Sequence, residues 1–351
     1  MERAMYLWQV ASGEPGRDYR RLFFDHDLML LGPSHLGEAR TGAYAGSIPN
    51  SAGSQVHNFA TQPQPGDRVL LRLGKTVIGI GRIPDGSEDQ YTFDETFRCV
   101  YGWDLCHRRR VTWAEGVDLN VFRGIYDKAK QKPSFTRVHE THIVEMVRSI
   151  PDAAFSRPLK PLPEIDHRVY TEDNLGVALF TAGISNRNIE DILGALRQAD
   201  RLCQWYRASG SGRYPTEHEV VSHIVLPLFL GLGWSHQQIA VEWNRVDMAF
   251  FKRTPTDISN CVMVLEAKGL GQGLGEVSAQ PQAYAARLAL PNVQYIATTD
   301  GENLFLYQRH GDSWAENPVG YLNVTCLQHE YILPEGANPV DTLVKLQPSA
   351  I

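Results

Sequence analysis

Two carboxylates and a lysine stand in two apolar segments of the 351-residue chain. Asp247 is the one charged residue of VDMAFF, and Glu266 and Lys268 close the run CVMVLEAK. Alternate side chains of a strand point to one face, so Glu266 and Lys268 are expected to share a face. Burying an unpaired carboxylate is costly, so Asp247 is expected to meet a cation or a hydrogen-bond network. Carboxylates hold Mg²⁺ beside phosphate, and the ion activates a water, so this set suits phosphodiester hydrolysis.

The same stretch, VMVLEAKGLGQGLG, allows a second interpretation as a nucleotide-binding glycine loop. It has no clean G-x-G-x-x-G, and the chain has no G-x-x-x-x-G-K-[ST]. A dinucleotide-binding loop also follows its strand without an acid and a lysine on the last turn. The glycines are therefore predicted to let the backbone pass close to DNA or a metal. A strand-end ion pair for Glu266 and Lys268, and a turn carboxylate for Asp247, stay open as simpler alternatives.

A further acid is expected from a helix that begins after Thr216. The pair Thr216 and Glu219 has the spacing of a capping box, which gives Glu219 a structural reason to be there. Glu217 instead shares a helical face with Ile224 and Leu228. Glu217 is therefore the preferred acid of the site, and Glu219 is the alternative.

These residues resemble a known family. Asp247 followed by Glu266-Ala267-Lys268 resembles the D…(D/E)-x-K signature of the PD-(D/E)xK nuclease superfamily, with Val246 in the place of the namesake proline. Residues 280–284 resemble the Q-x-x-x-Y motif of type I restriction subunits and related nucleases. Residues 216–234 and 297–307 resemble the opening helix and the later hairpin of that domain, so the likeness covers about residues 214–310.

The resemblance implies a role for each matching residue. Asp247 and Glu266 would hold Mg²⁺, or Mn²⁺ in its place, and Lys268 would position the attacking water. Gln280 and Tyr284 would contact DNA or brace the lysine; as plain helix residues they would do neither.

The N-terminal third resembles a different group, the small PUA/EVE-like barrels. Residues 1–115 are predicted to be mostly β, and PGDRVLLRLGKTVIGIGRI predicts two strands joined by a tight turn at Gly74-Lys75. The stretches LWQVA and YGWDLCHRRRVTW complete the likeness. Such domains bind nucleic acid, and some flip a modified base into an aromatic pocket.

Two residue sets follow from that likeness. The candidates for a base pocket, which could equally be barrel core, are Trp8, Tyr101, Trp103 and Trp113. The candidates for phosphate contact, which could equally be a solvated strand end, are His107, Arg108, Arg109 and Arg110.

Composition limits the setting of these sites. The net charge of −6 gives no global signal for nucleic acid, although a local basic face would suffice. The five cysteines include no C-x-x-C pair, so a zinc site is not expected and a reducing cytoplasm fits. No stretch has the length and apolarity of a membrane helix.

The predicted organisation is α/β with three parts. Residues 1–115 form the PUA/EVE-like barrel. Residues 116–213 form a partly helical connector, with an extended segment SRPLKPLPEI and a helix over 185–206 capped by Ser185 or Asn186. Residues 214–351 form the nuclease domain around a mixed sheet.

The predicted protein combines a domain that recognises DNA with a domain that cleaves it. The N-terminal domain would recognise a modified base, a 5-substituted cytosine, in duplex DNA. The C-terminal domain would be a Mg²⁺-dependent endonuclease of modification-dependent restriction type, acting as a homodimer for double-strand cleavage. The alternatives are a type II-like or RNA-directed nuclease that reads unmodified nucleic acid, and a nucleic-acid-binding protein with an inactive nuclease fold.

Overall fold

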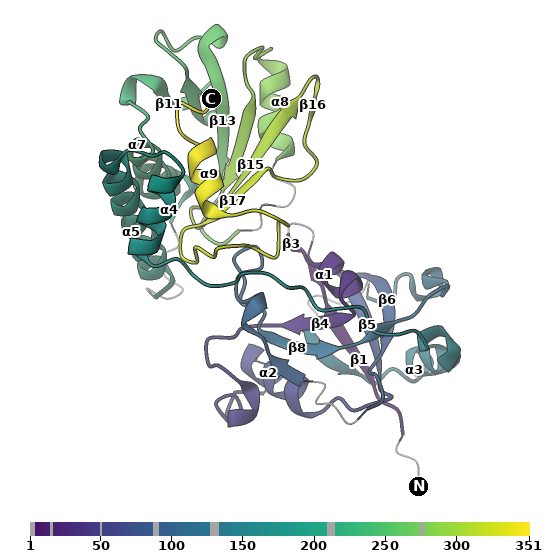
Figure 1. The fold of residues 1–351 in the computed structure, drawn as a ribbon. Coiled ribbons are helices and arrows are strands. Elements are labelled where there is room, and N and C mark those ends of the chain that lie inside the picture. Colours follow the sequence, from purple (N-terminus) through teal and green to yellow (C-terminus); the bar gives the residue numbers. More distant parts are fainter. Residues whose placement is uncertain are drawn as a thin grey trace. The chain divides into compact units, whose positions relative to one another are not determined.

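The computed structural model describes residues 4–14, 17–49, 51–86, 91–126, 133–208, 215–272, 274 and 278–351. The chain divides into two compact units, Met1–Glu164 and Ile165–Ile351 (Figure 1). The segment predicted as a connector is thus divided at Glu164, its first half packing within the first unit and its second half within the second. The fold is mixed α/β, as predicted.

The first unit is built mainly from short strands. Its strands are β1 (Leu7–Ala11), β2 (Gly13–Glu14), β3 (Arg17–Asp18), β4 (Leu28–Leu31), β5 (Arg68–Leu73), β6 (Thr76–Arg82), β7 (Tyr91–Phe93), β8 (His107–Arg110), β9 (Thr112–Trp113) and β10 (Phe135–Val138). Its helices are α1 (Arg20–Asp25), α2 (Ala52–Thr61) and α3 (Thr141–Arg148). A five-stranded sheet has the order β10-β1-β5-β6-β9, and a three-stranded sheet has the order β4-β8-β7.

The predicted hairpin is present, but it does not belong to a closed barrel. β5 and β6 pair antiparallel from Arg68 with Arg82 to Leu73 with Thr76, leaving Gly74-Lys75 as the turn. Gly74 has a φ of +56°, a backbone conformation that glycine adopts without steric cost. β1, however, pairs parallel with β5. The described strands of this unit lie in separate sheets, so the closed barrel expected from the hairpin is not formed by them.

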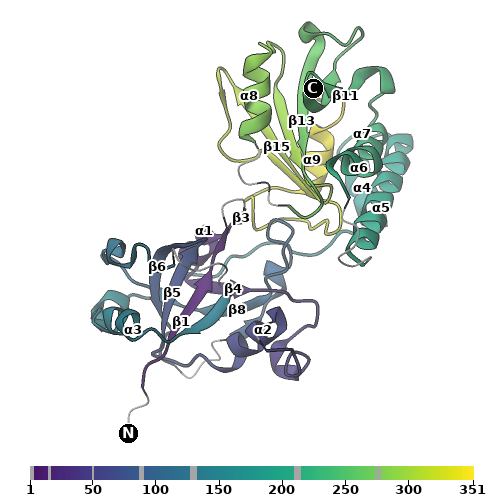
Figure 2. The same cartoon turned by 180° about the vertical axis from the view of Figure 1, so that it is seen from behind.

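The second unit places helices on both faces of one mixed sheet (Figures 1 and 2). Its strands are β11 (Ile239–Trp243), β12 (Val246–Phe251), β13 (Cys261–Ala267), β14 (Tyr295–Thr299), β15 (Asn303–His310), β16 (Ser313–Trp314) and β17 (Gly320–Asn323). Its helices are α4 (Glu172–Thr181), α5 (Asn186–Ala208), α6 (Glu217–Val220), α7 (Leu226–Gly231), α8 (Ala279–Arg287) and α9 (Pro339–Lys345). The sheet order is β11-β12-β13-β14-β15-β16, and β17 also pairs with β15.

The local signals for this unit were sufficient to locate most of its elements. The hydroxyl of Ser185 accepts a hydrogen bond from the backbone N–H of Asn188, which confirms the predicted start of α5. A π-helical turn over Val221–Val225 joins α6 to α7, so the helix predicted after Thr216 continues to Gly231. β13 and β14 run parallel, and the connection between them contains α8.

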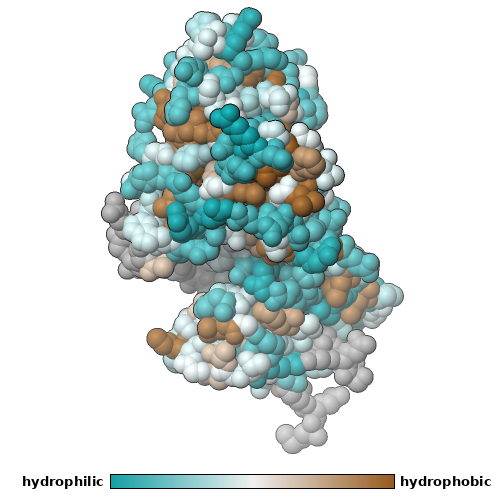
Figure 3. All heavy atoms as spheres, turned by 60° about the vertical axis from the view of Figure 1, so that its left-hand side comes forward, coloured by the Kyte–Doolittle hydropathy of each residue, from teal (hydrophilic) through white to brown (hydrophobic). Residues whose placement is uncertain are grey.

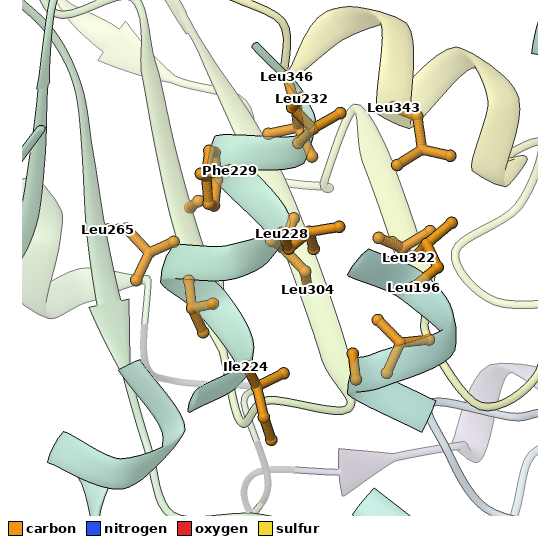
Figure 4. Packing of buried hydrophobic residues seen from close by; sticks show 14 of the residues in the cluster. Leu196, Ile224, Leu228, Phe229, Leu232, Leu265, Leu304, Leu322, Leu343 and Leu346 are labelled. Atoms are coloured by element: carbon orange, nitrogen blue, oxygen red, sulfur yellow. The ribbon is translucent and has the colours of Figure 1, made fainter. Parts of the chain in front are cut away.

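One large apolar core holds the helices to the sheet. Leu228 and Phe229 of α7, Leu265 of β13 and Leu304 of β15 are all nearly inaccessible to solvent. They meet between the layers, together with Leu343 of α9 (Figure 4). α8 packs against β13 and β14 on the other face of the sheet.

The proline-rich segment 156–165 is extended, but it is bound along the first unit. Arg157 forms a bidentate ion pair with Asp27, which is fully buried, at 2.5 Å for both guanidinium nitrogens. The backbone N–H of Lys160 donates to the same carboxylate, and His26 contacts the carbonyl of Pro161. The backbone N–H of Asp166 donates to the carboxylate of Glu330 in the second unit, and the N–H of Glu330 donates to the carbonyl of Asp166.

The surface is mostly polar, with scattered apolar patches in the view of Figure 3. The most exposed large apolar side chains of the second unit include Val177 and Phe180 of α4, at 67% and 61% exposed. Among the described helices, none is both long and apolar enough to cross a bilayer.

The core of the second unit can be tested with a cavity variant. Leu228→Ala removes a side chain that is 3% exposed, so the free energy of unfolding should fall by about 2–5 kcal/mol. Val177→Ala, at an exposed site, is the matched control and should change it by less than about 0.5 kcal/mol. Denaturant unfolding of the whole chain measures both, and an equal effect of the two variants would contradict the described packing.

Candidate active site

Asp247 and Glu266 face each other across β12 and β13. The antiparallel register pairs Met248 with Leu265, and one further step along it sets Asp247 opposite Glu266. Directly opposed residues of such a pair share a face of the sheet. Since Met248 and Leu265 belong to the core beneath α5 and α7, the alternation of strand side chains directs the two carboxylates to the other face.

Lys268 joins the carboxylates into one cluster at the end of β13. Its Nζ lies 2.7 Å from Oε1 of Glu266 and 3.7 Å from Oε1 of Glu217. Asp247 is tied to the same strand end, because its Oδ2 accepts the backbone N–H of Ala267 at 2.7 Å. The three acids and the lysine that the sequence predicted to act together are therefore within one cluster.

The cluster carries more negative than positive charge. Burial raises the pKa of Glu266, and the hydrogen bond from Lys268 opposes that rise. Burial also raises the pKa of Asp247, against the N–H of Ala267 and the charge of Lys268. Burial alone would lower the pKa of Lys268, but Glu266, Glu217 and Asp247 together raise it. Three carboxylates around one ammonium form an environment in which added positive charge would be stabilised.

The residues present fit a divalent metal ion. Glu266 is 2% exposed, and its Oε2 has no hydrogen-bond partner among the described residues. Two opposed carboxylates give the hard oxygen ligands that Mg²⁺ prefers, and phosphate and water complete its shell. No three His, Cys, Asp or Glu side chains of the described chain are gathered as a ready metal site. Asp247 and Glu266 would therefore hold the ion together with oxygens of the substrate and solvent.

The hairpin before Asp247 is conformationally unusual. Asn244 and Arg245 form its two-residue turn, with φ of +52° and +72°, as a type I′ turn requires. Glu242 also has a positive φ, +55°. Two side chains hold this tip: His218 lies 3.0 Å from Glu242, and Arg287 of α8 donates to the carbonyl of Asn244 at 2.8 Å. Backbone in these sparsely populated regions persists only when its surroundings fix it, and such strain gathers at functional sites.

The two acids of the α6 helix have different partners. Glu219 accepts the backbone N–H of Thr216 at 2.9 Å, and the Thr216 hydroxyl accepts the N–H of Glu219, so the capping box is complete. Glu217 is half exposed, and its Oε1 lies 3.7 Å from Nζ of Lys268. This geometry agrees with the choice of Glu217 as the acid of the site, although its side chain does not point into the core.

The two residues of the α8 motif bond to each other, and the glycine loop is described only in part. Nε2 of Gln280 donates to the hydroxyl of Tyr284 at 3.1 Å; Gln280 is exposed and Tyr284 is partly buried. Within the described residues neither forms a hydrogen bond or ion pair with Asp247, Glu266 or Lys268. Of the loop glycines, 273 and 275 lie outside the described residues.

Two of the four predicted pocket aromatics are core residues of the first unit. Trp8 is 2% exposed, stacks on Phe135 and donates its indole N–H to Asp67. Trp113 is 3% exposed and donates to the carbonyl of Phe23. Rings with so little exposed surface have no face open to a base, which corrects the pocket prediction for these two.

The other two aromatics lie together in a tight turn. Tyr101 has a φ of +49°, and its ring centroid lies 6.2 Å from that of Tyr19. Trp103 is 45% exposed, and its backbone pairs with Val100 to close the turn. Trp103 is thus the predicted pocket residue whose ring is most accessible.

The basic run is largely internal, contrary to both sequence interpretations. His107, Arg108 and Arg109 are 0%, 8% and 4% exposed. Arg109 donates to the carbonyls of Phe59 and Ala60, and Arg108 pairs with Asp94. These residues belong to β8, and their side chains form hydrogen bonds and an ion pair within the first unit. They therefore lack the exposure that a phosphate contact needs. Arg110, which is partly exposed, donates to the carbonyl of Lys160.

One residue beside the cluster was not singled out from the sequence. Thr298 of β14 is paired in register with Glu266. Its only sequence signal is a hydroxyl in the otherwise apolar run YIAT, which does not reveal which strand lies next to it.

Comparison with protein-family models, with curated proteins and with solved structures finds no match to this chain. The proposals below therefore rest on the residues and their geometry.

The internal position of His107 gives a testable pH dependence. Burial lowers the pKa of His107 to about 4, against the bond to the Pro33 carbonyl that raises it. The unfolded chain, with an ordinary pKa near 6.5, binds this proton first as the pH falls. The stabilisation is therefore complete above about pH 6.5 and is lost towards pH 4, by up to about 3 kcal/mol.

Thermal unfolding of the wild type and of His107→Gln between pH 7.5 and 4 measures this effect. The wild type should lose more stability over that range than the variant, which has no proton to bind at this position. Parallel curves for the two proteins would show that His107 titrates as an exposed histidine does.

Proposed function

We propose that this chain is a Mg²⁺-dependent DNA endonuclease of modification-dependent restriction type. Its second unit would be a nuclease domain similar to the PD-(D/E)xK superfamily. The observation that supports this most is the cluster of Asp247, Glu266, Lys268 and Glu217, in which one buried carboxylate oxygen has no hydrogen-bond partner within the part of the chain that the structure describes. An inactive fold has no physical reason to keep such charge buried.

The residues of the cluster divide the work. Asp247 and Glu266 would hold Mg²⁺, which supplies Lewis acidity toward the phosphate and lowers the pKa of the attacking water. The carboxylates around Lys268 raise its pKa and keep it an ammonium. Its Nζ has three N–H donors and uses one on Glu266, so the others can orient a water or a phosphate oxygen. Glu217, 3.7 Å from the ammonium, adds a second negative charge that would restrain it.

The first unit would be the reader, in a PUA/EVE-like role with base flipping. Trp103 is the aromatic whose exposure suits stacking on a flipped base, and Tyr101 lies beside it. A 5-substituted cytosine in duplex DNA is the proposed target. One such site cuts one strand, so a double-strand break requires two chains, and a homodimer is proposed. The five cysteines are all free thiols, which suits a reducing cytoplasm.

The first test is a cleavage panel. Matched duplexes with cytosine, 5-methylcytosine, 5-hydroxymethylcytosine, its glucosylated form or N6-methyladenine are incubated with the protein and Mg²⁺. One modified duplex should be cut, EDTA should abolish cutting, and Lys268→Ala should lower the rate about 10²-fold or more, as loss of a charge-stabilising donor does. Lys252→Ala, an exposed lysine of the same unit, is the matched control.

Each other outcome selects another function. Equal cutting of all duplexes would keep the nuclease and remove the modified-base reader, and cutting of RNA alone would point to an RNA-directed nuclease. Binding of DNA without any cutting would favour the inactive fold.

The two acids of α6 are separated by a paired substitution. Glu217→Ala should lower the cleavage rate at least about tenfold, because it removes a charge beside Lys268. A tenfold loss corresponds to about 1.4 kcal/mol of activation free energy. Tm should change little. Glu219→Ala should instead lower stability by about 1 kcal/mol through loss of the cap. Cleavage rates and thermal unfolding are measured on both variants, and a cleavage loss in Glu219→Ala alone would reverse the assignment.

A further inference from the structure

A buried row of side chains crosses the sheet at the level of the carboxylates. Glu266 of β13 is in register with Thr298 of the parallel strand β14, and Thr298 is in register with Phe305 of β15. Residues paired in this way share one face of the sheet. With Asp247 opposite Glu266 on β12, the carboxylate of Glu266 has Asp247 on one side and the Thr298 hydroxyl on the other.

The two neighbouring oxygens in this row share an unusual property. Thr298 is fully buried, and its Oγ1 has no hydrogen-bond partner among the described residues. Oε2 of Glu266 is in the same condition. Buried polar atoms are almost always bonded, and each exception calls for an explanation. A valine would fill the position of Thr298 with the same shape and no unsatisfied hydroxyl.

The adjacent threonine shows what a structural hydroxyl looks like here. Thr299 is also buried, but its Oγ1 donates to the carbonyl of Asn303 at 2.7 Å and accepts the N–H of Gly301 at 3.0 Å. It closes the turn that joins β14 to β15. Thr298 has no such duty, so its hydroxyl is available to the cluster.

Adjacent strands lie about 4.8 Å apart, a gap that a rotation of the long Glu266 side chain can span. A hydroxyl is a donor, and an ionised carboxylate is only an acceptor. The two unpartnered atoms are therefore chemically complementary.

We infer that Thr298 is a positioning residue of this site: on rotation of the Glu266 side chain, the Thr298 hydroxyl donates to Oε2 of Glu266, to which it is not bonded in the structure, and Oε1 stays toward Lys268. The role of that hydrogen bond in cation binding rests on the proposed function. A carboxylate held on one oxygen loses less rotational freedom when its other oxygen binds a cation. Hydrogen bonds to a charged group are stronger than neutral ones, so the bond from Thr298 to the Glu266 carboxylate should measurably restrict the orientation of that carboxylate.

The first experiment needs no activity. Thr298→Val is made in the wild-type chain and in Glu266→Ala, and thermal unfolding is followed for each. If the hydroxyl donates a hydrogen bond to Glu266, the substitution lowers Tm by roughly 3–6 °C in the wild-type background and not in Glu266→Ala. If the hydroxyl only fills space, removing it raises Tm or leaves it unchanged in both backgrounds, and the inference is overturned.

Two further variants separate the effect of the proposed hydrogen bond on Tm from the effect of side-chain packing. Thr298→Ser keeps the donor and should retain the wild-type Tm more closely than the valine variant. Thr299→Val removes a hydroxyl bonded to the turn, so its Tm loss should be the same with and without Glu266. A serine variant that behaves like the valine variant would contradict a role for the hydroxyl.

The second experiment titrates Mn²⁺ alone into the whole protein by calorimetry. Thr298→Val should raise the dissociation constant for Mn²⁺ about tenfold, the equivalent of one charge-assisted hydrogen bond, and Thr298→Ser should restore it. Unchanged Mn²⁺ affinity in the valine variant would overturn the positioning role. A wild type that neither binds Mn²⁺ nor cleaves DNA would remove the proposed function, while the Tm comparison would still decide whether Thr298 grips Glu266.

Discussion

The buried carboxylate of Glu266 is the constraint around which the second unit is organised. A charge at 2% exposure is tolerated only with compensation, and here the compensation comes from Lys268, two residues along the same strand. Lys268 also lies 3.7 Å from Glu217, and the charges of Glu266, Glu217 and Asp247 raise the pKa of its ammonium. Without Lys268, the buried carboxylate of Glu266 would lose the positive charge that compensates it.

The rest of the unit supplies the fixed positions that this arrangement needs. The apolar core under α5 and α7 sets the register of β12 against β13, because a slip of one residue would move Asp247 to the core face. The tip of the β11–β12 hairpin is held by His218 and Arg287, which keeps an unfavourable backbone in place next to Asp247. The capping box at Thr216 fixes where α6 begins and so where Glu217 stands. Stability and site geometry therefore draw on the same contacts.

The sequence was informative where structure is local and misleading where it is not. The β5–β6 hairpin, the strand ends at Asp247 and Lys268 and the cap at Thr216 follow from patterns within a few residues. The burial of Arg109 could not be read in this way, since the carbonyl groups it satisfies lie 49 and 50 residues earlier. The pairing of β1 with β5 and β10 is equally remote in sequence, and the described strands lie in separate sheets instead of the expected barrel. The same limit hid Thr298, whose neighbour is known only from the register of β13 and β14.

The binding of the proline-rich segment to the first unit has a consequence for reach. Its anchors end at Pro161, and bonding within the second unit begins at Asp166, so only residues 162–165 lie between them. A chain advances at most about 3.3–3.6 Å per residue, which limits the separation of these two anchors to roughly 18 Å. Because the segment between the anchors is this short, the two units stay joined at a junction that cannot lengthen, whatever either of them binds.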